Sequence, residues 1–126
     1  MDLLEKMITP EQLHDFFAHT RELKRQGRAH YDIDQVCRWS YFLIDADREK
    51  LTLASRHLEQ HGYEVVGFLE PTAEDEDQET LYLRFDKVER HTPDSLLARN
   101  AELCRLAADF GLKGYDGMDV GAVEGP

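Results

Sequence analysis

The sequence predicts a single α+β domain of the ferredoxin-like type, with elements in the order βαββαβ and an extra N-terminal helix. Three observations predict this class. The length of 126 residues suits one domain. Segments of strand-like hydrophobicity are separated by segments of helical periodicity. Right-handed crossovers would then place two helices on one face of a four-stranded antiparallel sheet.

The first helix is predicted over about residues 10–26. Thr9 can cap it, Pro10 suits the first helical position, and Gln12 completes a capping box. Gly27 marks its end. We expect this helix to cover part of the other sheet face or an edge. The expected organisation is an N-terminal helix and linker over residues 1–32, the ferredoxin-like domain over residues 33–120, and a flexible tail over residues 121–126.

Two predicted strands flank the second helix. Residues 35–44 (QVCRWSYFLI) are rich in aromatic and β-branched types, which favour a strand. Asp45 is then expected to cap a helix over about residues 46–61, which Gly62 ends. Residues 63–69 (YEVVGFL) form the next predicted strand.

The second half of the chain predicts a hairpin, a helix and a last strand. Residues 70–79 (EPTAEDEDQE) contain six acids and a proline, so we expect a solvated loop between hairpin strands. Alternating apolar and polar residues from Leu81 onward predict the following strand. Thr92 opens a helix over about residues 93–110, and a short strand is expected within residues 112–120.

The charge of the chain limits the classes of partner. The formal net charge is −11. A nucleic-acid surface needs clustered Lys and Arg, so direct binding of RNA or DNA is disfavoured, as is binding to acidic membranes. The third strand also lacks the glycines and the aromatic spacing of an RNA-recognition motif. A basic protein surface is the partner that this charge favours.

Nothing in the sequence indicates secretion or membrane insertion. The first residues, MDLLEKMITP, lack the basic and long apolar regions of a signal peptide. The longest apolar run, residues 41–44, is too short to span a bilayer. Cys37 and Cys104 match no zinc or redox spacing and are expected to be free thiols. We therefore expect a cytoplasmic protein.

No residue pattern indicates a catalytic, metal or cofactor site. His57 and His61 could share a helix face, but no third ligand is evident, so surface histidines are the favoured interpretation. A calcium loop beginning at Asp75 fails, because Thr80 and Asp86 stand where that loop requires Gly and Glu. No phosphate-binding loop or nucleophile elbow occurs. We therefore expect a binding protein without metal or cofactor, and not an enzyme.

The acidic segment over residues 70–79 is the first candidate for partner binding. Its carboxylates repel one another and bring little structural benefit, which favours a binding role. The candidate residues are Glu74, Asp75, Glu76, Asp77 and Glu79.

Three segments together resemble a known family. They are CRWSYFLIDAD, HLEQHGYEVV and AELCRLAADFGLKGYDGMDV. In order and spacing they are similar to the bacterial regulator of ribonuclease E activity B family, also called the ribonuclease E inhibitor B family. That family typically has a YDGW signature where this sequence has Tyr115-Asp116-Gly117-Met118. The resemblance covers about residues 33–120.

The resemblance implies a ferredoxin-like fold and a cytoplasmic regulator that binds ribonuclease E and restrains RNA cleavage. It adds Tyr115 and Asp116 as candidate partner-binding residues, beside a structural interpretation of the same motif that we favour. Two alternatives stay open. The chain could be a small acidic immunity-type protein that binds a basic toxin, or an unrecognised small-ligand or enzyme domain.

Overall fold

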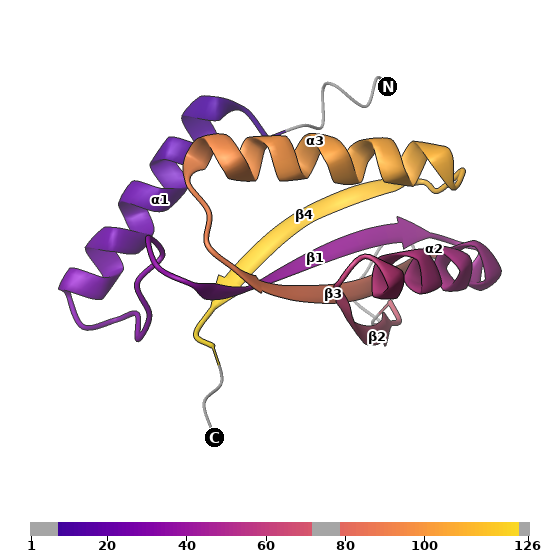
Figure 1. Cartoon of the computed structure of the whole chain (residues 1–126), viewed down its shortest axis with the longest axis horizontal. Coiled ribbons are helices and arrows are strands. Elements are labelled where there is room, and N and C mark those ends of the chain that lie inside the picture. The colour runs from indigo at the N-terminus through magenta and orange to yellow at the C-terminus, as the bar shows by residue number, and fades with distance from the viewer. Residues whose placement is uncertain (1–7, 72–78, 124–126) are drawn as a thin grey trace.

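The computed structural model describes residues 8–71 and 79–123, which form three helices and a four-stranded antiparallel sheet (Figure 1). The predicted α+β class is confirmed, and the order of elements is consistent with a ferredoxin-like arrangement preceded by a helix. The elements are α1 (Pro10–Arg25), β1 (Cys37–Asp45), α2 (Arg48–Gln60), β2 (Glu64–Leu69), β3 (Leu81–Glu89), α3 (Pro93–Asp109) and β4 (Gly114–Gly121).

The helices begin where side chains cap their first turn. In α1 the Thr9 hydroxyl accepts from the backbone N–H of Gln12 at 3.2 Å, and the Gln12 side chain accepts from the Thr9 N–H at 2.9 Å. This is the predicted capping box. The predicted cap of α2 is wrong, because Asp47 and not Asp45 is its N-cap residue. Asp45 still belongs to β1, and its carboxylate accepts from the backbone N–H groups of Asp47 and Lys113, both at 2.8 Å.

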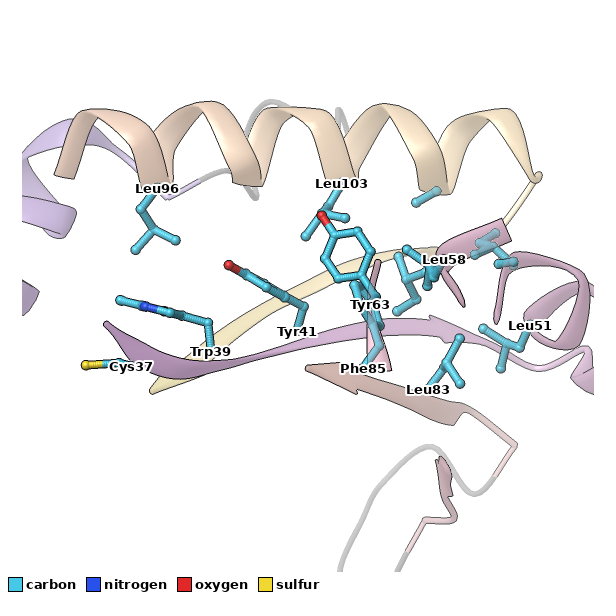
Figure 2. Packing of buried hydrophobic residues seen from close by; sticks show 14 of the residues in the cluster. Cys37, Trp39, Tyr41, Leu51, Leu58, Tyr63, Leu83, Phe85, Leu96 and Leu103 are labelled. Carbon is cyan, nitrogen blue, oxygen red and sulfur yellow. The ribbon is translucent and has the colours of Figure 1, made fainter. Parts of the chain in front are cut away.

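The sheet has the strand order β2-β3-β1-β4, so β1 and β3 are its central strands. Side chains along a strand alternate between the two faces. Trp39, Tyr41 and Leu43 of β1 therefore point to one face, and all three are fully buried. Figure 2 shows Trp39 and Tyr41 beneath Leu96 and Leu103 of α3, with Phe85 of β3 beside them.

Helix α1 extends the helical layer on this same face. Phe17 is fully buried and stacks on the Trp39 ring with centroids 6.1 Å apart, while Phe16 meets the same indole edge-on. Figure 1 shows α1 at the end of the sheet, beside the start of α3. Of the two positions expected for this helix, part of the other sheet face or an edge, the first is wrong, because α1 packs against Trp39 at the end of the sheet (Figure 1). The large indole of Trp39, near the start of β1, has apolar surface to bury, and α1 covers it.

A largely buried polar network joins α3 to the sheet. The carboxylate of Glu89, at the end of β3, accepts from the Tyr41 hydroxyl and from the guanidinium of Arg99 on α3, both at 2.7 Å. His91 Nε2 lies 3.0 Å from the same carboxylate, and His91 Nδ1 lies 2.8 Å from Ser95 Oγ in the first turn of α3. The side chains of Glu89 and Arg99 are only 14% and 19% exposed. The network therefore fixes α3 against β1 and β3 in a site that excludes most water.

The network holds Glu89 in its ionised form. Burial by itself would raise the pKa of this carboxyl, because it disfavours the charged state. Hydrogen bonds from His91, Tyr41 and Arg99 outweigh burial and lower the pKa of Glu89 from 4.5 to about 2. Since the pKa is depressed in the folded state, the stability that it contributes is present above about pH 4.5 and is lost as the pH falls toward about 2.

We expect Glu89→Gln to weaken the acid dependence of unfolding. At neutral pH the variant should lose roughly 2–4 kcal/mol of unfolding free energy, because Arg99 loses a charged partner in a mostly buried site. Between about pH 4.5 and pH 2 the wild-type protein should lose a Glu89 contribution of the order of 2–3 kcal/mol, which the variant lacks. Urea unfolding over this range checks both, with exposed Glu59→Gln as the control. Equal acid sensitivity of wild type and Glu89→Gln would contradict the assignment.

Candidate partner-binding surface

One face of the sheet carries no helix in the parts of the chain that the structure describes, and we call it the open face. Figure 1 shows α3 and α1 on the other side of the sheet. The strand registers arrange the open-face residues in rows that cross the sheet from β2 to β4. The rows are Leu69, Tyr82, Ile44 and Gly114; Gly67, Arg84, Phe42 and Gly117; Glu64, Asp86, Ser40 and Asp119; and Val88, Arg38 and Gly121.

A buried carboxylate organises the polar half of the open face. Asp86 on β3 is only 1% exposed, although it lies on the face without a helix. Arg38 on β1 covers it, with Nε 2.7 Å from Asp86 Oδ2, and Arg84 covers it from the same strand, with Nε 3.2 Å from Asp86 Oδ1. Ser40 also hydrogen bonds to this carboxylate. Arg38 extends further to pair with Glu64 on β2, so the cluster links three strands.

The cluster keeps Asp86 ionised. Burial acts to raise the pKa of Asp86, but hydrogen bonds from Arg84, Ser40 and Arg38 outweigh burial, and the pKa lies below its ordinary value. The two guanidinium groups therefore have a permanent counter-charge beneath them. Their planar donors are held against the sheet, and much of their positive charge is compensated within the protein.

Shallow hollows lie on both sides of Arg38. One of about 320 Å³ lies toward β2 and is lined by Glu64, Asp86 and Val88 among others. The other, of about 280 Å³, lies toward β4 and is lined by Asp119 and Gly121 among others. Both combine apolar walls with charged groups. They offer recesses for the side chains of a partner rather than an enclosed site for a small molecule.

The other half of the open face is apolar. Phe42, Ile44 and Tyr82 are half-buried, and they are not among the side chains packed against the buried core. Leu69, next to Tyr82 in the same row, is 49% exposed. Aromatic, aliphatic and arginine side chains on one surface are typical of protein interfaces. The arrangement is therefore suited to binding a protein segment.

The structure separates the two candidate residues of the Tyr115-Asp116-Gly117 motif. Tyr115 faces the helices, where its hydroxyl donates to Asn100 Oδ1 of α3 at 2.6 Å, and burial raises the pKa of this tyrosine. Asp116 is exposed and is the extra residue of a bulge, because Phe42 pairs with Gly117 while Leu43 pairs with Tyr115. These positions support a structural role for Tyr115, and partner binding by the exposed Asp116 stays a proposal.

The acidic candidates are described only in part. Glu74, Asp75, Glu76 and Asp77 lie outside the described residues, and Glu79 is exposed. At the other end of this segment, the exposed Glu70 accepts from Arg48 of α2 at 3.3 Å. The segment connects β2 to β3, so both of its ends adjoin the apolar row that contains Leu69 and Tyr82.

The histidine and cysteine residues were the candidates for metal binding and redox chemistry. The rings of His57 and His61 stack with centroids 4.1 Å apart, but no group of three or more His, Cys, Asp or Glu is placed to hold a metal ion within residues 8–71 and 79–123. Cys37 and Cys104 are both free thiols, as expected. No helix in the same residues has the length and apolar character needed to cross a membrane.

The chain from Ser95 through His91 to Glu89 was not identified from the sequence. It contains the residue types of a nucleophile, a base and an acid. However, Ser95 Oγ also accepts from the backbone N–H of Thr92 at 2.8 Å and forms part of the capping box of α3. The hydroxyl is thus engaged in capping the first turn of α3, and its hydrogen bonds are those of a helix start.

Sequence reasoning also missed the cluster around Asp86. The alternation of Tyr82, Arg84 and Asp86 predicts that these residues share one face of a strand. It does not reveal that Arg38, 48 positions earlier, lies over the same carboxylate. The sequence signal for this cluster is an aspartate two residues after an arginine in a strand of alternating polarity. This signal identifies the cluster only when the strand register, which brings Arg38 to the same carboxylate, is known.

The sequence of the chain matches one family of known proteins. Residues 18–120 match the model of the family described as regulator of ribonuclease activity B. The match begins within α1 and ends within β4, so it includes most of the sheet and both helices α2 and α3. A search of curated proteins found no match.

We expect Tyr115→Ala to act on stability and not on binding. The variant should lose roughly 2–4 kcal/mol of unfolding free energy, because it empties a site beneath α3 and leaves Asn100 Oδ1 without its donor. Tyr115→Phe, which removes only the hydroxyl, should lose about 1 kcal/mol. Circular dichroism melts and a titration with the partner, corrected for the folded fraction, measure the two effects. An unchanged melting temperature with at least about tenfold weaker binding would instead identify Tyr115 as an interface residue.

Proposed function

The chain belongs to the regulator of ribonuclease activity B family, and on this basis we propose that it binds ribonuclease E and slows RNA cleavage without being catalytic itself. The observation that carries this proposal is the match over residues 18–120, because the family is described by its regulation of ribonuclease activity. Ribonuclease E as the target is the finer part of the proposal, and it comes from the resemblance of the three sequence segments.

The charge of the chain supports a partner with basic segments. A nuclease must hold phosphates with Lys and Arg, so the segments through which it contacts RNA are positively charged. A protein of net charge −11 is attracted to those same segments. We therefore propose that the chain docks on a basic segment of the nuclease or of its assembly, and in doing so hinders RNA from reaching it.

More than half of the net negative charge lies in the acidic segment, residues 70–79. Residues 70–79 contribute −6 of the net charge of −11. Concentrated charge of this kind raises the rate of encounter with a partner of opposite sign and adds less to the lifetime of the complex. We propose that Glu74, Asp75, Glu76, Asp77 and Glu79 steer the partner toward the protein.

The first test is whether the purified protein binds and inhibits. It should leave RNA intact on its own, bind ribonuclease E from its own host, and lower the initial rate of RNA cleavage by that enzyme in proportion to the fraction bound. An unrelated ribonuclease assayed in parallel should be unaffected, which controls for binding of the protein to RNA. Absence of binding to the host enzyme would refute the proposal, and binding to a basic toxin encoded by a neighbouring gene would favour the immunity-type alternative. RNA hydrolysis by the pure protein would refute the non-catalytic part.

The second test concerns the acidic segment. A variant with its six acids changed to Asn or Gln should associate with the nuclease roughly tenfold more slowly at low salt, and its association rate should depend less on salt. Its unfolding free energy should stay close to wild type, because solvated charges add little stability. A control variant removes the same number of exposed acids from the three helices: Glu11, Asp15, Glu59, Asp94, Glu102 and Asp109. Equal slowing in both variants would show that net charge matters and the place of the acidic segment does not.

A further inference from the structure

The open face has features of a contact surface that the long-range attraction of the acidic segment does not explain. We propose that this face binds a basic segment of the partner that carries an apolar or aromatic anchor residue. The inference rests on the proposed function, because it identifies where and by what chemistry the partner is held.

The apolar half supplies the contact for the anchor. Leu69 is 49% exposed, and Phe42, Ile44 and Tyr82 are half-buried in the same row and the next one. The opposite face already buries the core of the domain against α1, α2 and α3. Part of the apolar surface of the open-face side chains stays in water, and an aromatic or aliphatic side chain of a partner would bury it.

The charges around this apolar area favour a basic partner. Arg38 and Arg84, whose side chains are 26% and 38% exposed, share the carboxylate of Asp86, and Arg38 also pairs with Glu64. Glu64 is nevertheless 64% exposed, and with the exposed Asp119 at the opposite edge the face has three carboxylates against two guanidinium groups. The groups that reach furthest into water are therefore carboxylates at both edges of the face. They attract Lys and Arg and repel the phosphates of RNA.

The two edge strands favour binding across the face over the addition of a strand. Both edges contain a bulge with a glycine at positive φ, Gly67 in β2 at 149° and Gly117 in β4 at 105°. Bulges interrupt the regular row of backbone groups that a new strand would need. The same glycines flank the row of Arg84 and Phe42, and a Cβ at either would meet no atom within 4 Å. The space at Gly117 beside Phe42, and at Gly67 beside Arg84, lets another chain approach these two side chains closely.

The surface can be mapped with a probe that does not depend on the identity of the partner. A short synthetic peptide of Lys, Arg and Ser with one central Trp is titrated into the isotope-labelled full chain, and backbone amide shifts are recorded. Shifts are expected on β1 and β3, centred on Phe42 and Tyr82. A peptide with Ser in place of Trp should bind about tenfold more weakly, because it lacks the anchor.

A matched pair of variants tests the face itself. Leu69→Lys places a positive charge in the apolar row, and Leu53→Lys makes the same change on α2, where Leu53 is 55% exposed. Both residues are about half exposed, so neither change should disturb folding, which melts will verify. Leu69→Lys should weaken binding of the Trp peptide and of ribonuclease E by about tenfold, whereas Leu53→Lys should leave both close to wild type.

Different outcomes separate this inference from the proposed function. Failure of the wild-type protein to bind ribonuclease E, with the peptide still mapping to the open face, would refute the proposed target alone. Binding of ribonuclease E that Leu69→Lys does not weaken would overturn the inference alone. Peptide shifts confined to the helices, or no shifts at millimolar peptide, would also overturn it. So would stronger shifts of the same amides with an RNA oligonucleotide, or with protein concentration alone, which would identify RNA or a second copy as the occupant.

Discussion

Two carboxylates on β3, the buried Asp86 and the largely buried Glu89, lie three positions apart and therefore on opposite faces of the sheet. Glu89 holds α3 through Arg99 and the central strand through Tyr41. Asp86 holds Arg38 and Arg84 flat on the face without a helix. A one-residue slip of β3 would exchange the two faces and leave both carboxylates without their partners. The register of this strand thus fixes the helical layer and the open face together.

The two faces of the sheet differ in what their side chains contribute. The helix-facing side supplies stability, because its apolar side chains and the Glu89 network are removed from water. On the open face, compensation of Arg38 and Arg84 by Asp86 leaves the edges acidic around an apolar half. In the proposed mechanism, attraction by the acidic segment acts at a distance and sets how often a basic partner arrives, whereas apolar contact acts within a few ångströms and sets how long it stays. A regulator of a ribonuclease can use both, since its target must be basic to handle RNA.

Much of the fold could be predicted from the sequence, and the exceptions have physical causes. The capping box at Thr9, the start of a helix at Thr92 and the alternation along β3 depend on residues only a few positions apart. The placement of α1 depends on the packing of Phe17 against Trp39, a contact that no local pattern reveals. The cap of α2 was misplaced because Asp45 continues β1 and bonds to Lys113, a partner 68 positions away. Of the candidate site, the sequence indicated acidic residues and one short motif, and it missed the open face.

By itself the sequence determined the class of fold, the order of its elements, the family and the acidic charge that favours a basic partner. The family comes from the resemblance of three sequence segments, and the rest follows from composition and from interactions between near neighbours in the chain. Only the tertiary structure decided that Arg38 covers Asp86, that Tyr115 packs under α3 while Asp116 points outward, and that one sheet face lacks a helix in the described residues. Each of these depends on strand register, a bulge or helix packing. All three are set by contacts between residues far apart in the sequence, and their energies appear only when the chain has folded.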